Sequence, residues 1–249
     1  MTYTPRTRLF VEAPLSAGAA VAASEGQAHY LNHVMRAKAG DAVALFNGRD
    51  GEWAAHVAYP SRRLVQLDVR ERLREQTADP DVWLVFAPVK RIEFLVEKAT
   101  ELGAAALHAV FTRRTNMARV NTARLKAHCM EAAEQSDRLS VPEVSEARPF
   151  MDVMAAWPAG RRLYFLDETG GGAPIAELLL REKTGNDANV KTPCAFLTGP
   201  EGGFDQSELD ALRRLPFATA VGLGPRILRA ETAALAALAC WQAFCGDWG

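Results

Sequence analysis

The hydrophobic pattern of this 249-residue chain changes near residue 82, and that change limits the folds it can adopt. Before it, short apolar or alternating runs are broken by Gly, Asn and Pro, as in antiparallel β structure. After it, strand-like runs alternate with helical patterns, which favours an α/β fold with a mostly parallel sheet. We therefore predict a small β-barrel domain at 1–73, a polar linker at 74–80 and an α/β domain at 81–249.

The first part contains four strand-like runs and one helix-like run. The strand-like runs are "RLFVE", "AVALFNG", "GEWAAHVAYP" and "RLVQLDVRERL", and "NGRDG" between two of them is a hairpin signal. Ser24 is a candidate N-cap for a helix that Gly40 would end. Residues 1–74 carry ten Lys and Arg against seven Asp and Glu. This excess permits a polyanionic partner without requiring one.

The second part predicts five buried strands and four helices. The strands are "VWLVFAPV", "ALHAVF", "RRLYFLDE", "CAFLTG" and "TAVGLG". The helices are expected at "KRIEFLVEKATELG", with Gly103 as its stop, at 122–138, from the cap Asp205 onward, and at about 230–244. Glu208 lies three residues after Asp205, as in a capping box.

Composition excludes several classes of protein. Hydrophobic residues make up 49% of the chain, enough for a full core. The four cysteines have no metal-site spacing, and we expect reduced thiols in a cytoplasmic protein. His29 and His33 share a helical face but have no third ligand nearby, so no metal is expected. The N-terminus lacks a signal-peptide core, and the longest apolar segment, 232–241, is too short to span a bilayer.

Two Gly-Pro stretches near the end of the chain are the main functional signal. "TGPEGGF" (198–204) and "GLGPRILRAETAA" (222–234) each follow a strand-like run. Glycines let a ligand approach the main chain closely, and Pro200 stiffens the first loop. One such loop would be an ordinary turn, but a pair at strand ends favours a ligand site, for example for a purine edge. The chain has no P-loop motif, and Ile227 occupies the third glycine position of a dinucleotide fingerprint.

The same stretches resemble the signature of the SPOUT methyltransferases. "HYLNHVMRAKAGD", "KRIEFLVEKATELG" and "EAAEQSDRLSVP" resemble further blocks of the RsmE-type 16S rRNA uridine-N3 methyltransferases, in the same order. The resemblance covers almost the whole chain. It implies a PUA-like RNA-binding barrel, a SPOUT domain with a trefoil knot, S-adenosyl-L-methionine as cofactor, a homodimer, and 16S rRNA of the small ribosomal subunit as substrate.

The resemblance also implies which residues hold the cofactor. Three strand ends or loops would wrap it, and Ile227 would form an apolar wall. The residues are Leu166, Asp167, Glu168, Leu197, Thr198, Gly199, Pro200, Glu201, Gly202, Gly203, Leu223, Gly224, Ile227 and Leu228. For Leu223, Ile227 and Leu228, a plain core position is the alternative.

Two residues are candidates for catalysis. The N3 proton of uracil must leave before or during methyl transfer, so a base or a cation that stabilises the anion would help. We predict that Arg229 stabilises the anion, since its guanidinium offers two parallel donors. Glu231 is a candidate base or a partner that orients Arg229; alternatively, it is a carboxylate that interacts with the helix dipole.

Eight cations are candidates for contacts with RNA phosphates. They are Arg8, Arg36, Lys38, Lys90, Arg91, Arg113, Arg114 and Arg138. About half are expected to matter, because any one of them can be an ordinary surface charge. The apolar helix at 230–245 is expected to supply core and dimer interface, with Trp241 as an anchor.

Two other hypotheses remain open. The chain could be a SPOUT enzyme for another RNA, such as a tRNA or rRNA ribose, or a non-catalytic RNA-binding assembly factor. The intact "GPEGG" and "ILRAET" stretches argue against the second.

Overall fold

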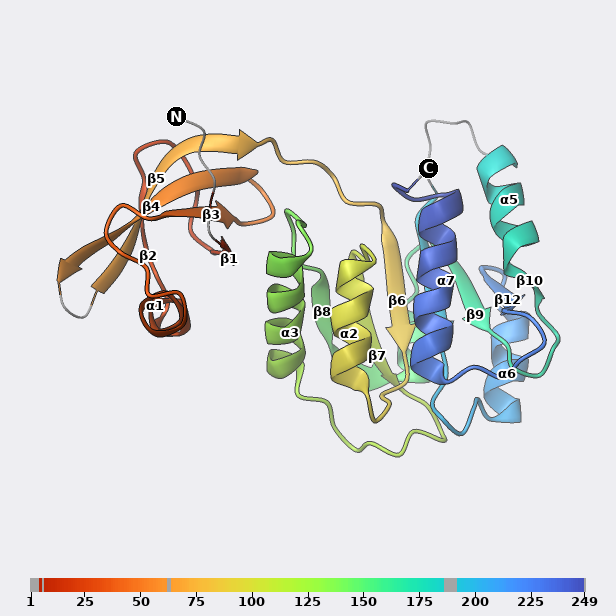
Figure 1. The fold of residues 1–249 in the computed structure, drawn as a ribbon. Coiled ribbons are helices and arrows are strands. Elements are labelled where there is room, and N and C mark those ends of the chain that lie inside the picture. Colours follow the sequence, from red (N-terminus) through yellow and green to blue (C-terminus); the bar gives the residue numbers. More distant parts are fainter. Residues whose placement is uncertain (1–4, 6, 62–63, 186–191, 249) are drawn as a thin grey trace. The chain divides into compact units, whose positions relative to one another are not determined.

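The fold is that of a computed structural model, which describes residues 5, 7–61, 64–185 and 192–248. The chain divides into two compact units (Figure 1). Unit 1 comprises Met1–Ala78 and Ala133–Val141, and unit 2 comprises Asp79–Ala132 and Pro142–Gly249. Each unit is described below by itself.

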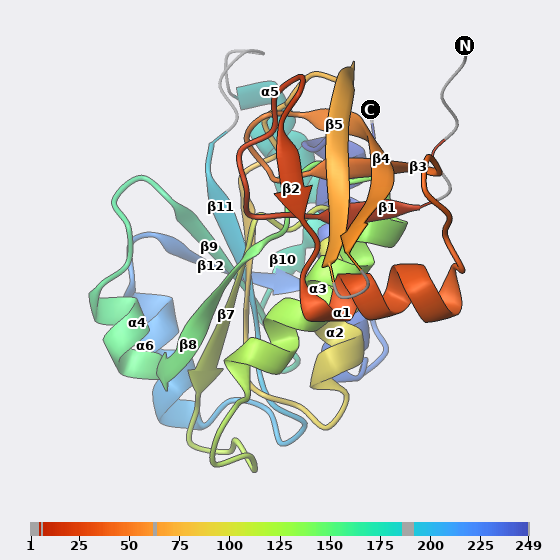
Figure 2. The same ribbon diagram turned by 90° about the vertical axis from the view of Figure 1, so that its left-hand side faces the viewer.

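Unit 1 is built on a five-stranded sheet. Its strands are β1 (Arg8–Phe10), β2 (Ala20–Ala22), β3 (Ala42–Phe46), β4 (Glu52–Ser61) and β5 (Leu64–Arg74). They lie in the order β1-β3-β4-β5-β2, and every pair is antiparallel except β1 with β3. β2 and β5 run across the direction of β1 and β3, so the sheet curls around its apolar core (Figure 2).

The helical segment of unit 1 is shorter than the predicted 24–40. Ser24 caps α1 (Glu25–His29) in a capping box with Gln27, which confirms the predicted start. A π-helical turn, η1 (Tyr30–Val34), follows and ends the helix before Gly40. Arg36 has a φ of 50°, a left-handed conformation that interrupts helical geometry.

Arg8 fixes the segment 133–141 within unit 1. Its guanidinium donates to the carbonyl oxygens of Ala133 (2.8 Å) and Arg138 (2.6 Å) and to the carboxylate of Glu52 (2.6 Å). Arg74 also donates to Glu52, at 2.8 Å. Burial acts to raise the pKa of Glu52, but these two arginines outweigh it and hold the pKa below its ordinary value.

Unit 2 contains a seven-stranded sheet in which all described pairs are parallel, which confirms the predicted α/β class. The order is β10-β12-β9-β11-β6-β7-β8. The strands are β6 (Val82–Phe86), β7 (Ala106–Phe111), β8 (Glu143–Pro149), β9 (Arg162–Leu166), β10 (Ala173–Pro174), β11 (Cys194–Thr198) and β12 (Ala218–Gly222). The strands β8 and β10 were not predicted.

Helices cover both faces of this sheet (Figure 2). They are α2 (Ile92–Glu101), α3 (Thr122–Gln135), α4 (Phe150–Ala155), α5 (Ile175–Gly185), α6 (Gln206–Arg214) and α7 (Ala230–Phe244). α4 and α6 lie on one face, where Phe165, Leu197 and Leu212 form part of a buried cluster. α2 and α7 lie together on the other. In the described part of the chain, no helix combines the length and apolarity needed to cross a bilayer.

Candidate active site

Three neighbouring strands of unit 2 end together, and the predicted cofactor residues come directly after them. β12, β9 and β11 are consecutive and parallel, and β6 and β7 continue the sheet beyond β11. We call the line along which these five strands end the carboxyl edge. In open parallel sheets, ligands bind in the crevice outside this edge.

The loop after β11 is a tight turn. The amide of Gly203 donates to the carbonyl of Pro200 at 2.9 Å. Gly203 has a φ of +67°, which residues with a Cβ avoid. A methyl group added at Gly199 would lie 3.0 Å from the ring of Phe204. Both glycines are therefore needed for the shape of the loop itself.

Two neighbouring loops hold this turn. The amide of Lys90, after β6, donates to Oε1 of Glu201 at 2.9 Å. Arg114, after β7, donates to the carbonyl of Gly202 at 3.1 Å and lies 3.6 Å from the carboxylate of Asp205. The turn is thus fixed by contacts within the protein.

Glu208 anchors the next segment. It is 5% exposed, and its carboxylate accepts hydrogen bonds from the amides of Arg113 (2.8 Å) and Asp205 (2.9 Å). The predicted capping box of α6 is confirmed. The bond to Arg113 adds a link that joins the start of α6 to the loop after β7.

Asp167 organises the end of β9. Its carboxylate is fully buried and accepts hydrogen bonds from the amide and hydroxyl of Thr169 and from Arg213, the last at 3.0 Å. Burial alone would raise the pKa of Asp167, but these hydrogen bonds and the charge of Arg213 lower it below its ordinary value. Asp167 therefore stays ionised, and its carboxylate holds the loop after β9 in place through Thr169 and Arg213.

Glu168, the next residue, is exposed. Its carboxylate lies against the turn after β11, where any side chain at Gly203 would collide with it. Asp167 and Glu168, adjacent in sequence, thus differ in burial and in partners.

The loop after β12 is open by comparison. Among the described residues, no hydrogen bond involves the main chain of 223–228. Gly224 has a φ of +95° with open space around it, and the Ile227 side chain is 90% exposed. The amide groups of this loop can donate hydrogen bonds to a ligand, and its carbonyl groups can accept them. The predicted contact of Ile227 with the cofactor stays a prediction.

Arg229 and Glu231 stand at the start of α7. Arg229 is the N-cap residue through its backbone, and its exposed side chain makes no capping hydrogen bond. The Glu231 side chain is 7% exposed, and its Oε1 lies 3.9 Å from Nη1 of Arg91. The hydroxyl of Thr198 donates to the carbonyl of Ala230 at 3.3 Å, which joins β11 to this helix start.

The eight predicted RNA contacts fall into two groups. In unit 2, Lys90 and Arg91 follow β6, and Arg113 and Arg114 follow β7, so all four lie along the carboxyl edge. In unit 1 are Arg8, Arg36, Lys38 and Arg138. Since the Arg8 side chain is only 13% exposed and is bonded within unit 1, it is the least suited of the eight to bind RNA.

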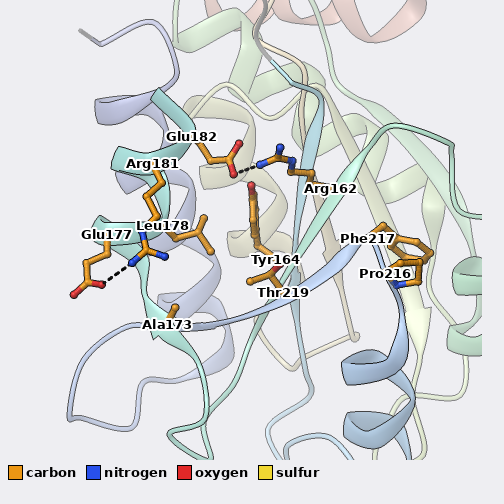
Figure 3. A pocket seen from close by; sticks show the side chains of 10 residues that line it. All are labelled: Arg162, Tyr164, Ala173, Glu177, Leu178, Arg181, Glu182, Pro216, Phe217 and Thr219. Carbon is orange, nitrogen blue, oxygen red and sulfur yellow. Dashed lines mark hydrogen bonds and ion pairs between the residues drawn. The ribbon is translucent and has the colours of Figure 1, made fainter. Parts of the chain in front are cut away.

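A hollow in unit 2 lies apart from these loops (Figure 3). It has a volume of about 450 Å³ and lies between α5, β9 and β12. Two ion pairs line it, Arg162 with Glu182 and Arg181 with Glu177, and Tyr164 points into it between them (Figure 3). None of the predicted cofactor residues lines this hollow.

Some residues of the carboxyl edge were not predicted. Arg213 lies on α6 with no motif around it, and its bond to Asp167 spans 46 positions. The packing of Phe204 against Gly199, after β11, was also not predicted. The same holds for the hydrogen bonds from Thr169 to Asp167, after β9. Within the described residues, no group of three or more His, Cys, Asp or Glu side chains could hold a metal.

Comparison with known families gives two matches. A model described as the RNA methyltransferase domain matches residues 76–242, and one described as the RNA methyltransferase PUA domain matches residues 24–70. The first match contains both Gly-Pro loops and all four cations of the carboxyl edge.

Individual relatives are similar over most of their length. The Ribosomal RNA small subunit methyltransferase E of Rickettsia conorii is 28% identical over 93% of each chain. The protein of that name from Synechocystis is 32% identical over 89% of this chain and 72% of its own. The crystal structure of a Ribosomal RNA small subunit methyltransferase E from Neisseria gonorrhoeae bound to S-adenosyl methionine has 25% identity and a TM-score of 0.82, covering 98% of this chain and 99% of that one.

Proposed function

The chain belongs to the RNA methyltransferase family, and from that premise we propose that it methylates N3 of a uridine in the 16S rRNA of the small ribosomal subunit, using S-adenosylmethionine. It is an enzyme of the SPOUT class with an N-terminal PUA domain. The observation that carries the proposal is the convergence, at one edge of a parallel sheet, of two glycine loops and four cationic side chains.

The loops suit S-adenosylmethionine. The main chain of 223–228, unpaired among the residues that the structure describes, and the rigid turn at 199–203 lie on either side of the end of β9. Donors and acceptors from both would reach one flat ligand. Residues 166–168, through their main chain, would hold it together with 197–203, Leu223, Gly224, Ile227 and Leu228. When bound, it supplies an electrophilic methyl group.

The four cations of the carboxyl edge suit an RNA strand. Lys90, Arg91, Arg113 and Arg114 follow adjacent strands, so they form a row along which backbone phosphates can be bound. A base has to leave its stack for its N3 to reach the loops, and phosphate contacts with this row of cations would hold the strand in that state.

Arg229 is proposed to stabilise the uracil anion. Its side chain is exposed at the start of α7, next to the loop after β12, and it makes no capping hydrogen bond. A guanidinium directed at O2 or O4 would stabilise the charge that develops as the N3 proton leaves. The Glu231 side chain is 7% exposed and lies 3.9 Å from Arg91, so we propose that it supports this region and does not contact the reacting base.

Further features are proposed from family membership. They are the trefoil knot around the two loops, a homodimer that uses α7, a cytoplasmic location, and the domain division at 1–73, 74–80 and 81–249. Trp241, the predicted anchor of the dimer interface, is only 4% exposed within the single chain and belongs to its core instead. For the dimer, the support is α7 itself, where Ala and Leu dominate and only part of the apolar surface is buried.

The test is methyl transfer from labelled S-adenosylmethionine to small subunits that lack the modification, with naked 16S rRNA alongside. Nucleosides from the digested product are identified by mass spectrometry. N3-methyluridine on subunits is the expected result. Transfer to a ribose or to tRNA would replace the substrate, and a failure to bind S-adenosylmethionine would favour the assembly factor.

A further inference from the structure

Glu168 has a central place at the carboxyl edge. It directly follows Asp167 at the end of β9, and β9 lies between β12 and β11. Its carboxylate is therefore placed between the open loop after β12 and the turn after β11. Contact with Gly203 fixes it on the side of the turn.

Glu168 also differs from the other carboxylates of this edge by having no partner. Across the residues that the structure describes, Glu168 makes no hydrogen bond and no ion pair. Each of the others has at least one: Asp167 with Thr169 and Arg213, Glu201 with the amide of Lys90, Asp205 with Ser207 and Arg114, Glu208 with two amides, and Glu231 with Arg91. The fold thus uses five carboxylates and leaves one for a ligand.

We propose that Glu168 is the base that accepts the N3 proton of the target uridine, an inference that rests on the proposed function. One carboxylate oxygen of Glu168 takes the proton from N3. The electron pair left on N3 forms the bond to the methyl carbon, and the pair of the broken carbon–sulfur bond stays on sulfur. Glu168 then returns its proton to water, which its exposed position allows.

The alternatives among nearby carboxylates are less suitable. Asp167 is fully buried and bound by three donors, so it cannot reach a substrate without dismantling its loop. The Glu231 side chain is 7% exposed and faces Arg91. Of the acidic groups at the end of β9 and the start of α7, only Glu168 is both exposed and unpaired among the described residues.

The electrostatic surroundings agree with this role. Although Glu168 is exposed as a residue, partial burial of its carboxylate against the turn and the negative charge of Asp167 raise its pKa, and Arg114 lowers it to a smaller extent. A carboxylate with a raised pKa binds a proton more readily, and base strength nearer the operating pH improves proton transfer.

Glu168→Gln tests the proposal, because it keeps the shape and removes the basic oxygen. At neutral pH, the single-turnover rate of N3-methyluridine formation should fall by about 100-fold or more. Affinity for S-adenosylmethionine, measured by calorimetry on the protein alone, should be unchanged. Glu168→Asp should retain part of the rate. Glu177→Gln, which removes the same charge from α5, is the matched control and should behave as the unaltered protein.

A substrate with a more acidic N3 proton tests whether Glu168 accepts that proton or only positions the substrate. In small subunits whose rRNA carries 5-fluorouridine, the N3 imide loses its proton more easily. The defect of Glu168→Gln should shrink on this substrate and as the pH rises, since less help is needed from the enzyme.

Two outcomes would overturn the assignment. Weaker cofactor binding in proportion to the lost rate would make Glu168 a cofactor ligand, and an unchanged rate would leave it without a role. If the unaltered protein forms no N3-methyluridine at all, the proposed function itself fails, which is distinct from either outcome.

Discussion

The loops after β11 and β12 are similar in sequence but differ in how they are supported. The first is tied by the amide of Lys90, by Arg114 and by its own Pro200–Gly203 hydrogen bond. In the second, residues 223–228 have no main-chain hydrogen bond among the described residues, and Ile227 is 90% exposed. One loop is preformed by the fold, and the other keeps its polar groups for a ligand. Substitutions in the first should therefore affect stability, and those in the second should affect binding or rate.

Arg229→Ala should give the largest effect, and on rate alone. Removing a donor that stabilises a developing anion costs about 100- to 1000-fold in rate. The melting temperature and the affinity for S-adenosylmethionine should change little, because the side chain makes no capping bond. Single-turnover methylation and calorimetry measure these quantities. Arg229→Lys, which keeps the charge without the fork, should recover only part of the rate. Equal losses of rate and cofactor affinity would instead make Arg229 a cofactor residue.

Gly203→Ala should come next and should affect the preformed loop. A positive φ with a Cβ, together with the collision with Glu168, should cost about 2–3 kcal/mol of unfolding free energy. The matched variant is Gly224→Ala in the open loop, where φ is also positive but nothing lies within 4 Å. Urea denaturation should show a smaller loss for Gly224→Ala. Equal losses would mean that the two loops do not differ in support.

Glu208→Gln should be milder, because the amide retains one acceptor oxygen. Its NH₂ group would face either the amide of Arg113 or that of Asp205, leaving one buried donor unpaired. The expected cost is about 1–2 kcal/mol of unfolding free energy. Ser207→Ala, on the exposed side of the same cap, is the control and should cost less. A loss of methylation without a loss of stability would place Glu208 in the reaction rather than in the fold.

The regular elements of this fold follow from local sequence, whereas the carboxyl edge does not. The capping box of Asp205 and Glu208, the stop at Gly103 and the strand-like runs around both loops predicted their elements, because each depends on neighbouring residues. β8 has an exposed, polar edge-strand pattern and was missed. The predicted helix at 24–40 was too long because Arg36 adopts a left-handed conformation, which the spacing of apolar residues does not reveal.

The partners of each side chain at the site depend on contacts between residues far apart in the sequence, so they could not be predicted from local patterns. That Glu168 is unpaired depends on the strand order β12-β9-β11 and on Arg213 binding Asp167 from α6. Neither has a signature in the residues around position 168. The family resemblance predicts Asp167 and Glu168 alike as cofactor contacts, and only the arrangement of their neighbours distinguishes the two.

Ile227→Ala should have the smallest effect on stability and so tests the open loop most directly. Because its side chain is 90% exposed, the free energy of unfolding should change by less than about 0.5 kcal/mol. Calorimetry should nevertheless show weaker binding of S-adenosylmethionine if Ile227 forms the predicted apolar wall. Leu180→Ala, at a 52% exposed position on α5 away from the loops, is the control for removing apolar surface. A stability loss well above that of Leu180→Ala would show that Ile227 is packed in the folded protein, and the loop after β12 would then be preformed like the loop after β11.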